Sequence, residues 1–537
     1  MMGSDFPLLI KTLLKTPLQV APKQEIISDG LRRYNYVEFN QRLNRFGSML
    51  NALDVKQGDV IAVLDWDTHR YLECFFAIPM YGAVLHTVNV RLSPAQIAYT
   101  IDHAEDDVIL VHADFIPLLD SVMTLVERTV RIIVMTDGAT DQVPVSSLDI
   151  IGNFEMLIDA SDGDFVFPNF DENLRATTFY TTGTTGDPKA VAYTHRQLVL
   201  HTMGLLGGLG SRGTTGRFDD GDVYMPITPM FHVHGWGFPY AATLLGVKQI
   251  YPGRYVPSRL LHLIDSEGVS FSHCVPTILH MLLTAPEAEG TDFSKWKVII
   301  GGAALPRGMA EDAMARGINV FSAYGMSETC PLLTIAHLNP KDEGDLGPRL
   351  KTGRPVAMVE LRVVDHAMND VPRDGKTTGE IVARAPWLNT EYVKNPDATA
   401  ELWKNGYLHT GDVGYLDDDG ALVITDRMKD VIKSGGEWIS SLALESIASA
   451  QGGVSEVAAI GVPDDKWGER PMLMVVLVPD SDPNHVHARI MAAFASQIEQ
   501  GAISKWAAPE RIDFVSAIAK TSVGKIDKKL LRQETCG

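Results

Sequence analysis

The sequence has few cysteines, and their placement excludes two kinds of site. Only four of its 537 residues are cysteine. These residues, Cys74, Cys274, Cys330 and Cys536, are scattered, with no CxxC pair and no histidine at the spacing of a metal ligand. We therefore expect neither a disulfide framework nor a zinc site. Sparse, unpaired cysteines also fit a reducing compartment, so we expect a cytoplasmic location.

Basic residues are also in short supply. The chain has 47 Lys and Arg against 67 Asp and Glu, which gives a formal net charge of −20. Binding to nucleic acid needs basic surface to displace the counterions of the phosphates, so we expect no nucleic-acid partner. A site for an anionic ligand remains compatible with this balance, because such a site needs only local positive charge.

Long apolar runs are absent as well. The most apolar long stretch, residues 71–90, contains Glu73, Pro79 and His86, which are too polar for a membrane span. It predicts a buried helix running into a strand, and we expect no integral membrane segment. The first seven residues place an acid and a proline where a signal peptide needs basic and then apolar residues, so we expect no signal peptide.

The length and the alternation of patterns predict the fold class. Short β-branched runs at residues 60–64, 108–111, 131–135 and 298–300 alternate with amphipathic segments such as 258–267 and 306–316, which indicates α/β layers. After residue 420 the order changes to strand 422–425, helix 442–450, strands 457–460 and 473–477, and helix 488–500. We therefore predict an α/β protein. A large N-terminal domain of layered α/β subdomains spans residues 1–426, and a small α+β C-terminal domain spans residues 431–537.

One segment indicates a phosphate-binding loop. Residues 180–189 read Tyr-Thr-Thr-Gly-Thr-Thr-Gly-Asp-Pro-Lys. Two glycines allow close approach of the backbone, four threonines supply hydroxyl donors, and Lys189 supplies a cation, as a triphosphate requires. It is not a Walker loop, because Gly and Lys are not adjacent and no Ser or Thr follows the Lys. A polar glycine-rich hairpin without a ligand is the alternative.

This loop is the first of seven sequence blocks that resemble the motifs of the adenylate-forming superfamily of acyl-CoA synthetases, adenylation domains and luciferases. The blocks follow in the expected order along nearly the whole chain. They are residues 180–189 (phosphate loop), 230–237 (acyl pocket), 301–306 (adenine side), 324–329 (nucleotide and magnesium), 407–412 (ribose), 426–432 (hinge) and 520–525 (catalytic lysine). The resemblance implies an acid–thiol ligase that uses ATP, Mg²⁺ and coenzyme A. It also implies that the C-terminal domain is mobile.

The resemblance implies a role for individual residues. Lys525, Glu328 and Lys189 would be catalytic, and Thr184 and Glu328 would bind the metal. Nucleotide and coenzyme A would contact Thr181, Thr182, Gly183, Thr184, Thr185, Gly186, Gly302, Ala303, Ser322, Ala323, Tyr324, Ser327, Asp412, Arg427, Lys433, Gly435, Gly436 and Trp438. The acid would contact Phe231, His232, Val233 and Trp236.

Physical chemistry agrees with these roles. A carboxylate such as Glu328 is a hard oxygen ligand for a cation that bridges phosphates, although it could instead cap a short helix. Asp412 can accept hydrogen bonds from two vicinal ribose hydroxyls. The substrate carboxylate is already ionised, so Lys525 would act by screening the repulsion of two anions rather than as a base.

The hinge residue implied by the resemblance is Lys429, within residues 427–430. Rotation about it would deliver Lys525 for adenylation and then present residues 433–440 for thioester formation, where Gly435 and Gly436 let a thin pantetheine chain pass. Related fatty-acyl ligases are often homodimers, and for this chain a homodimer is analogy alone.

The acyl-pocket block is most similar to that of medium- and long-chain fatty-acid ligases, in which an aromatic residue at the position of Trp236 gates the fatty-acid tunnel. Core packing is the alternative for Trp236. A ligase for an aryl, short or sulfur-containing acid remains open, and so does an adenylation enzyme that loads a carrier protein. Outside this class, a non-catalytic acyl or nucleotide sensor would be expected to lack Lys525, Glu328 or the loop threonines, and all are present.

Two positions depart from the usual pattern of the superfamily. Ala190 follows Lys189 where glycine is usual, and Ser327 stands where many members have threonine. The hydroxyl is kept at Ser327, so the expected phosphate contact is kept too.

Overall fold

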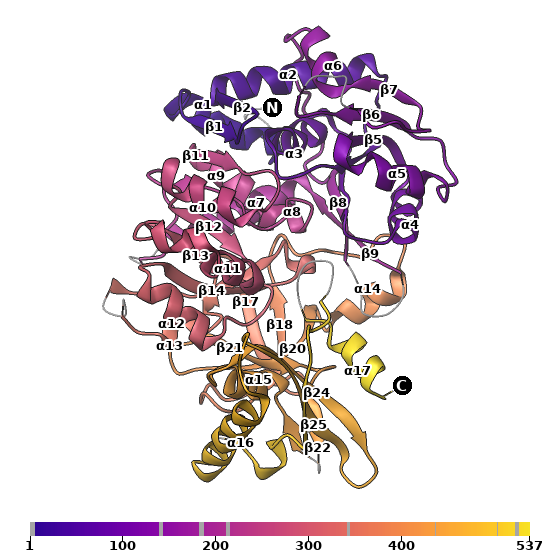
Figure 1. Cartoon of the computed structure of the whole chain (residues 1–537). Helices are drawn as coiled ribbons and strands as arrows, with labels where there is room; N and C mark the ends of the chain where they lie inside the picture. The colour runs from indigo at the N-terminus through magenta and orange to yellow at the C-terminus, as the bar shows by residue number, and fades with distance from the viewer. Residues whose placement is uncertain are drawn as a thin grey trace.

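The computed structural model describes residues 6–138, 143–181, 187–210, 215–340, 344–434, 437–501, 503–520 and 526–536, and only the backbone of 437, 438 and 536. These residues form a mixed α/β protein whose large N-terminal part lies above a small C-terminal sheet with its own helices (Figure 1). The predicted fold class is confirmed. No helix among the described residues is long and apolar enough to cross a membrane.

The first sheet has seven strands within the described residues, in the order β7-β6-β5-β3-β4-β8-β9, and only β9 runs antiparallel to its neighbour. The strands are β3 (Val60–Leu64), β4 (Val84–Thr87), β5 (Asp106–His112), β6 (Arg131–Met135), β7 (Ile150–Asn153), β8 (Arg175–Thr181) and β9 (Lys189–Thr194). The helices beside it are α2 (Tyr36–Ala52), α3 (His69–Tyr81), α4 (Pro94–Ala104), α5 (Ile116–Met123) and α6 (Phe154–Ala160).

Both faces of this sheet are buried, which explains its unbroken apolar runs. Ile61 and Val63 face the core formed with α2 and α3, whereas Ala62 and Leu64 face α4 and α5. The apolar stretch 71–90 forms most of α3 and then β4, as predicted, with Pro79 inside the helix.

The second sheet runs β16-β15-β14-β13-β12-β10-β11-β1-β2. Its strands are β1 (Glu25–Ser28), β2 (Arg32–Asn35), β10 (Val223–Tyr224), β11 (Lys248–Tyr251), β12 (Phe271–Cys274), β13 (Lys297–Ile300), β14 (Asn319–Gly325), β15 (Leu332–Ile335) and β16 (Arg354–Pro355). The helices of this part are α1 (Lys15–Val20), α7 (His195–Gly210), α9 (Phe238–Leu245), α10 (Pro257–Ser266), α11 (Pro276–Leu283), α12 (Arg307–Ala315) and α13 (Gly347–Leu350). One face shares a core with the first sheet, and α10, α11 and α12 cover the other.

The third sheet follows the order β17-β18-β20-β19, and β21 pairs with β20. Its strands are β17 (Glu360–Val364), β18 (Gly379–Arg384), β19 (Trp403–Lys404), β20 (Tyr407–Leu416) and β21 (Leu422–Arg427), with α14 (Pro396–Leu402) before β19. This sheet lies between the two larger sheets and the C-terminal part (Figure 1).

The C-terminal sheet runs β23-β22-β25-β24, with β26 beside β25. Its strands are β22 (Ile432–Ser434), β23 (Glu437–Ile439), β24 (Val454–Asp464), β25 (Gly468–Leu477) and β26 (Arg511–Phe514). Helices α15 (Ser441–Ser449) and α16 (Pro483–Glu499) pack on one face, and α17 (Lys528–Cys536) packs on the other (Figure 1). The strands and helices predicted for this region are confirmed within a few residues.

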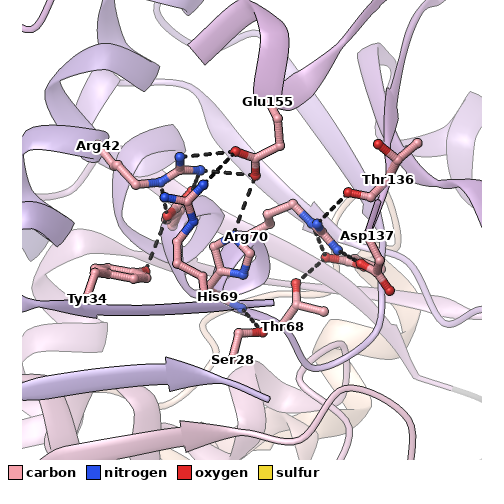
Figure 2. Close-up of polar contacts among 12 residues, drawn as sticks. Ser28, Tyr34, Arg42, Thr68, His69, Arg70, Thr136, Asp137 and Glu155 are labelled. Atoms are coloured by element: carbon pink, nitrogen blue, oxygen red, sulfur yellow. Dashed lines mark hydrogen bonds and ion pairs between the residues drawn. The ribbon is translucent and has the colours of Figure 1, made fainter. Parts of the chain in front are cut away.

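A buried ion network ties α2, α3 and α6 together (Figure 2). The Arg42 guanidinium donates to both oxygens of Glu73, at 2.7 and 3.0 Å, and to both oxygens of Glu155, at 3.1 and 3.2 Å. Glu73 is 1% exposed. Burying charge is favourable only when it is paired and hydrogen-bonded, and this bidentate geometry meets the condition.

Candidate active site

The phosphate loop is carried by a hairpin of β8 and β9. Thr181 and Lys189 are the register partners next to the loop, and the Thr181 hydroxyl donates to the Lys189 carbonyl at 3.5 Å. Residues Thr182, Gly183, Thr184, Thr185 and Gly186 lie outside the described residues. Before the loop, the Tyr180 hydroxyl lies 2.8 Å from Nδ1 of His103 in α4, which anchors this end of β8.

Glu328 lies in a short 3₁₀ turn, η5 (Ser327–Thr329), and is 6% exposed. The hydroxyl of Tyr392 donates to its Oε1. The Lys189 ammonium lies 5.0 Å from the centroid of the Tyr392 ring. Tyr392 therefore brings the predicted metal ligand and the predicted phosphate lysine next to one side chain.

Three predicted nucleotide contacts form a second group. The Tyr324 hydroxyl donates to Oδ2 of Asp412 at 2.6 Å, and Nε of Arg427 lies 3.3 Å from Oδ1 of the same carboxylate. Asp412 and Arg427 are register partners on β20 and β21, whereas Tyr324 comes from β14. Burial and the neighbouring Asp412 raise the pKa of Tyr324, so its hydroxyl stays a donor.

The predicted adenine-side residues lie at the carboxyl edge of parallel strands. Ile300 of β13 pairs with Ser322 of β14, and the following Gly302 has φ +77°, a left-handed conformation that glycine adopts without strain. Gly302 is half-buried and Ala303 is exposed, whereas Ser322 and Ala323 are buried. The Ser322 hydroxyl has no hydrogen-bond partner among the described residues. Ligands of open α/β sheets bind at such carboxyl edges.

The acyl-pocket block has an unusual backbone. Five successive residues have positive φ, namely Val233 (48°), His234 (57°), Gly235 (55°), Trp236 (57°) and Gly237 (75°). This segment, labelled α8 (Val233–Trp236), is therefore a left-handed turn. Each non-glycine residue costs about 1–2 kcal/mol in this region, and such strain is concentrated at functional sites.

The left-handed turn places Trp236 against the adenine side. A Cβ atom on Gly301 would lie 3.0 Å from Cη2 of Trp236, so the glycine lets the indole approach this backbone closely. The centroid of the indole also lies 5.2 Å from that of the His273 ring, which stacks on Phe238 at 4.7 Å. Burial lowers the pKa of His273 to about 3, so the ring is neutral and belongs to an apolar wall.

The other predicted acid contacts lie in the same block. Phe231 and Val233 are buried, and His232 is half-buried. The Phe231 carbonyl accepts from the Thr87 hydroxyl at 2.9 Å, and the Arg91 guanidinium lies 5.9 Å from the Phe231 ring. These contacts fix the entry to the turn relative to β4 of the first sheet.

The predicted hinge leads directly from β21 to the C-terminal sheet. Lys429 is exposed as a whole residue, but partial burial of its ammonium and the neighbouring Arg427 lower its pKa. Asp430 accepts from Arg532 of α17 at 2.9 Å. Lys433 lies in β22 and the backbone of Trp438 in β23, whereas Gly435, Gly436 and Lys525 lie outside the described residues.

A family comparison identifies this arrangement. The sequence profile described as "AMP-binding enzyme" matches residues 14–393, and "AMP-binding enzyme C-terminal domain" matches residues 443–525. The chain belongs to the AMP-binding enzymes. This AMP-binding enzyme is an AMP-forming acid–thiol ligase that uses ATP, Mg²⁺ and coenzyme A, as the resemblance implied.

Relatives of this AMP-binding enzyme extend over nearly its full length. It is 38% identical to a 3-methylmercaptopropionyl-CoA ligase of Ruegeria lacuscaerulensis, over 98% of this chain and 97% of that one. It is 37% identical to a long-chain-fatty-acid–CoA ligase of Thermus thermophilus, over 95% and 93%. A solved anthranilate–CoA ligase with bound anthranoyl-AMP shares the fold, with a TM-score of 0.86 at 23% identity, over 100% and 99%.

The donor set of this AMP-binding enzyme fits a magnesium ion that arrives with its nucleotide. Among the described residues, no group of three or more His, Cys, Asp or Glu is placed to hold a metal. Mg²⁺ is commonly held by one or two carboxylates together with substrate phosphates, and the buried Glu328 can supply one such oxygen.

One residue of the site was missed from the sequence. Tyr392 contacts Glu328 and Lys189, but it lies outside the seven blocks. It is 64 residues from Glu328 in the sequence, so no helix or strand periodicity links the two. A lone tyrosine carries no local signal that distinguishes a site residue from core. Only the pairing of distant segments reveals it.

Proposed function

We propose that this ligase activates unbranched aliphatic acids, medium- or long-chain fatty acids first, with Trp236 as the gate of the acyl pocket. The observation that carries the proposal is the left-handed turn, which holds the indole against Gly301 and next to the apolar wall at His273. An apolar wall suits a chain without charge, because any buried ionic group would need a partner. The relative from Thermus thermophilus supports this choice.

In the proposed first half-reaction, a carboxylate oxygen of the acid attacks the α-phosphorus of ATP. The bond from that phosphorus to pyrophosphate breaks, and acyl-AMP forms. Asp412 would accept from the ribose hydroxyls, with Arg427 beside it, and Lys189 would attract the phosphates. Mg²⁺, held at Glu328 and Thr184, would neutralise phosphate charge when bound.

The C-terminal domain, residues 431–537, would turn about Lys429 between the two half-reactions. In the first pose Lys525 would bridge the acid and the α-phosphate. In the second pose the segment with Lys433, Gly435 and Gly436 would guide coenzyme A, whose sulfur attacks the acyl carbonyl and releases AMP. A short connection between β21 and β22 supports such a hinge, because few residues need to change their dihedral angles.

A second candidate substrate is a short or sulfur-containing acid. Behind Trp236, the rings of His273, Phe238 and Tyr224 stack on one another, with centroid distances of 4.7 and 5.8 Å from His273. If these rings stay in place, Trp236 is the floor of a short pocket rather than a gate. The relative from Ruegeria lacuscaerulensis supports this reading.

The test is AMP release with Mg²⁺ and coenzyme A over saturated acids of graded length, benzoate and 3-(methylthio)propionate, for the wild type and Trp236→Ala. Wild-type turnover of medium and long acids supports the gate. If the wild type turns over short acids only and W236A also accepts longer ones, the result supports Trp236 as the floor of a short pocket. Turnover of benzoate alone would overturn both. Pyrophosphate exchange without AMP release that depends on coenzyme A would point to another acceptor, such as a carrier protein.

A further inference from the structure

Residues 389–394, here called the strap, contact several parts of the site at once. The Asn389 N–H donates to the Glu328 carbonyl at 2.9 Å, and the Val393 N–H donates to the Ala190 carbonyl at 3.1 Å. Tyr392 also forms a β-bridge with Val191 of β9. The strap therefore joins the turn that carries Glu328 to the strand that begins at Lys189.

The far end of the strap reaches the support of the phosphate loop. The Lys394 ammonium donates to the His103 carbonyl at 2.9 Å and pairs with Glu105 at 2.9 Å. His103 is the residue whose ring meets the Tyr180 hydroxyl at the start of the loop. The strap is thus fixed at both ends by backbone and ionic contacts, and Tyr392 lies between them.

The Tyr392 side chain touches two charged groups of opposite sign. Its hydroxyl donates to Oε1 of Glu328, and its ring faces the Lys189 ammonium at 5.0 Å from the centroid. Tyr392 is 8% exposed.

Each contact has a defined effect. A hydrogen bond from outside the metal shell fixes the orientation of a ligating carboxylate, and removing such bonds typically lowers metal affinity by about 10- to 100-fold. Mg²⁺ demands near-ideal octahedral geometry, so it is sensitive to this orientation. The face of an aromatic ring attracts an ammonium group without neutralising it, so Lys189 keeps its full charge for phosphate.

We propose that Tyr392 is a positioning residue with two separable actions. Its hydroxyl orients Glu328 for a divalent cation, and its ring holds Lys189 at the mouth of the phosphate loop. This inference rests on the proposed function, in which Glu328 and Lys189 bind the metal and the phosphates of ATP.

The test uses the full-length protein and two substitutions. Tyr392→Phe removes the hydroxyl and keeps the ring, whereas Tyr392→Leu removes both. Binding of ATP is measured by calorimetry with EDTA and over a Mn²⁺ titration, and the Mg²⁺ dependence of pyrophosphate exchange is measured in parallel. Tyr34→Phe is the matched control, since the buried Tyr34 hydroxyl also donates to a glutamate, Glu73, at 3.3 Å, and Tyr34 lies outside the seven blocks.

We expect Y392F to raise the metal concentration for half-saturation by about tenfold or more, with ATP binding in EDTA unchanged. Y392L should also weaken ATP binding in EDTA several-fold, and Y34F should change neither quantity. In a Glu328→Gln background, Y392F should have no further effect on the metal dependence. A merely structural role would instead lower the thermal midpoint of Y392F and leave its metal dependence at the wild-type value.

An unchanged metal dependence in folded Y392F, within twofold of the wild type, would overturn the inference while leaving the proposed function intact. An additive effect of Y392F in the E328Q background would overturn it too. Failure of the wild-type protein to bind ATP in the presence of Mn²⁺ would refute the proposed function itself, so the two failures are distinguishable.

Discussion

Replacing Arg42 by methionine should destabilise the N-terminal domain strongly. Methionine has a similar length and keeps the packing of the stem, but it removes all four hydrogen bonds to Glu73 and Glu155 (Figure 2). Glu155 would keep Arg32 at 3.2 Å and is partly exposed. Glu73 would keep only the Tyr34 hydroxyl at 3.3 Å among its described hydrogen-bond partners.

The size of the destabilisation follows from how few hydrogen-bond partners Glu73 keeps. Removing one partner of a buried ion pair costs about 3–5 kcal/mol, because the other charge stays buried without compensation. Typical domains are stable by about 5–15 kcal/mol, so the loss is a large fraction of the total. Removing both charges, as in Arg42→Met with Glu73→Gln, is often close to neutral, so the double variant should recover most of the loss.

The assay is urea unfolding followed by circular dichroism, with Arg45→Met on the same helix as the control. Arg45 makes one hydrogen bond, to the exposed Asp159 carbonyl at 3.3 Å, so R45M should cost well under about 1 kcal/mol. Equal destabilisation in R42M and in the R42M/E73Q double variant would refute the reasoning, because it would show that the cost is lost packing rather than an uncompensated charge.

Two further predictions concern the supports of the site. Asp67 accepts the Met230 N–H at 3.0 Å, and burial raises the pKa of Asp67 to about 7. The folded state therefore binds the Asp67 proton more tightly than the unfolded state does. The stability that this proton contributes is lost as pH rises from about 4 to 7. Asp67→Asn should remove this pH dependence. The free energy of unfolding of the variant, relative to that of the wild type, should therefore rise by roughly 2–3 kcal/mol between pH 5 and pH 8. A difference that does not change with pH would contradict this prediction. Separately, Gly325→Ala would place a Cβ atom 1.7 Å from the Pro331 carbonyl oxygen, whereas nothing lies within 4 Å of a Cβ at Gly308. G325A should lower the free energy of unfolding by at least about 3 kcal/mol and G308A should not, and equal thermal midpoints would contradict this expectation.

Much of the fold could be predicted because its signals are local. The run at 60–64 is buried on both faces, so its apolar pattern alone defines β3, and the stretch 71–90 gave both α3 and β4. The same holds for the change of pattern near residue 420, since β21, α15 and α16 follow in the predicted order.

The geometry of the site could be predicted only in part. The motif blocks placed Tyr324, Asp412 and Arg427 together, although they come from β14, β20 and β21. The left-handed turn at residues 233–237 was not foreseen, because Val, His and Trp normally avoid positive φ and only tertiary packing imposes it. Tyr392 was missed for a related reason, since its role depends on the strap pairing with β9.

In the proposed acyl pocket, the handedness of the turn restricts how the acid preference can change. A side chain on a left-handed turn leaves the backbone in a direction that no right-handed turn reproduces, so a shift to the ordinary conformation would carry the indole of Trp236 away from Gly301 altogether. A Cβ atom at Gly237 would lie 2.6 Å from the ring of His201 in α7, so that position cannot become bulkier without displacing this ring. New acid ranges are therefore reached most directly by exchanging the side chain at position 236 or the rings behind it, while the backbone that presents it stays fixed.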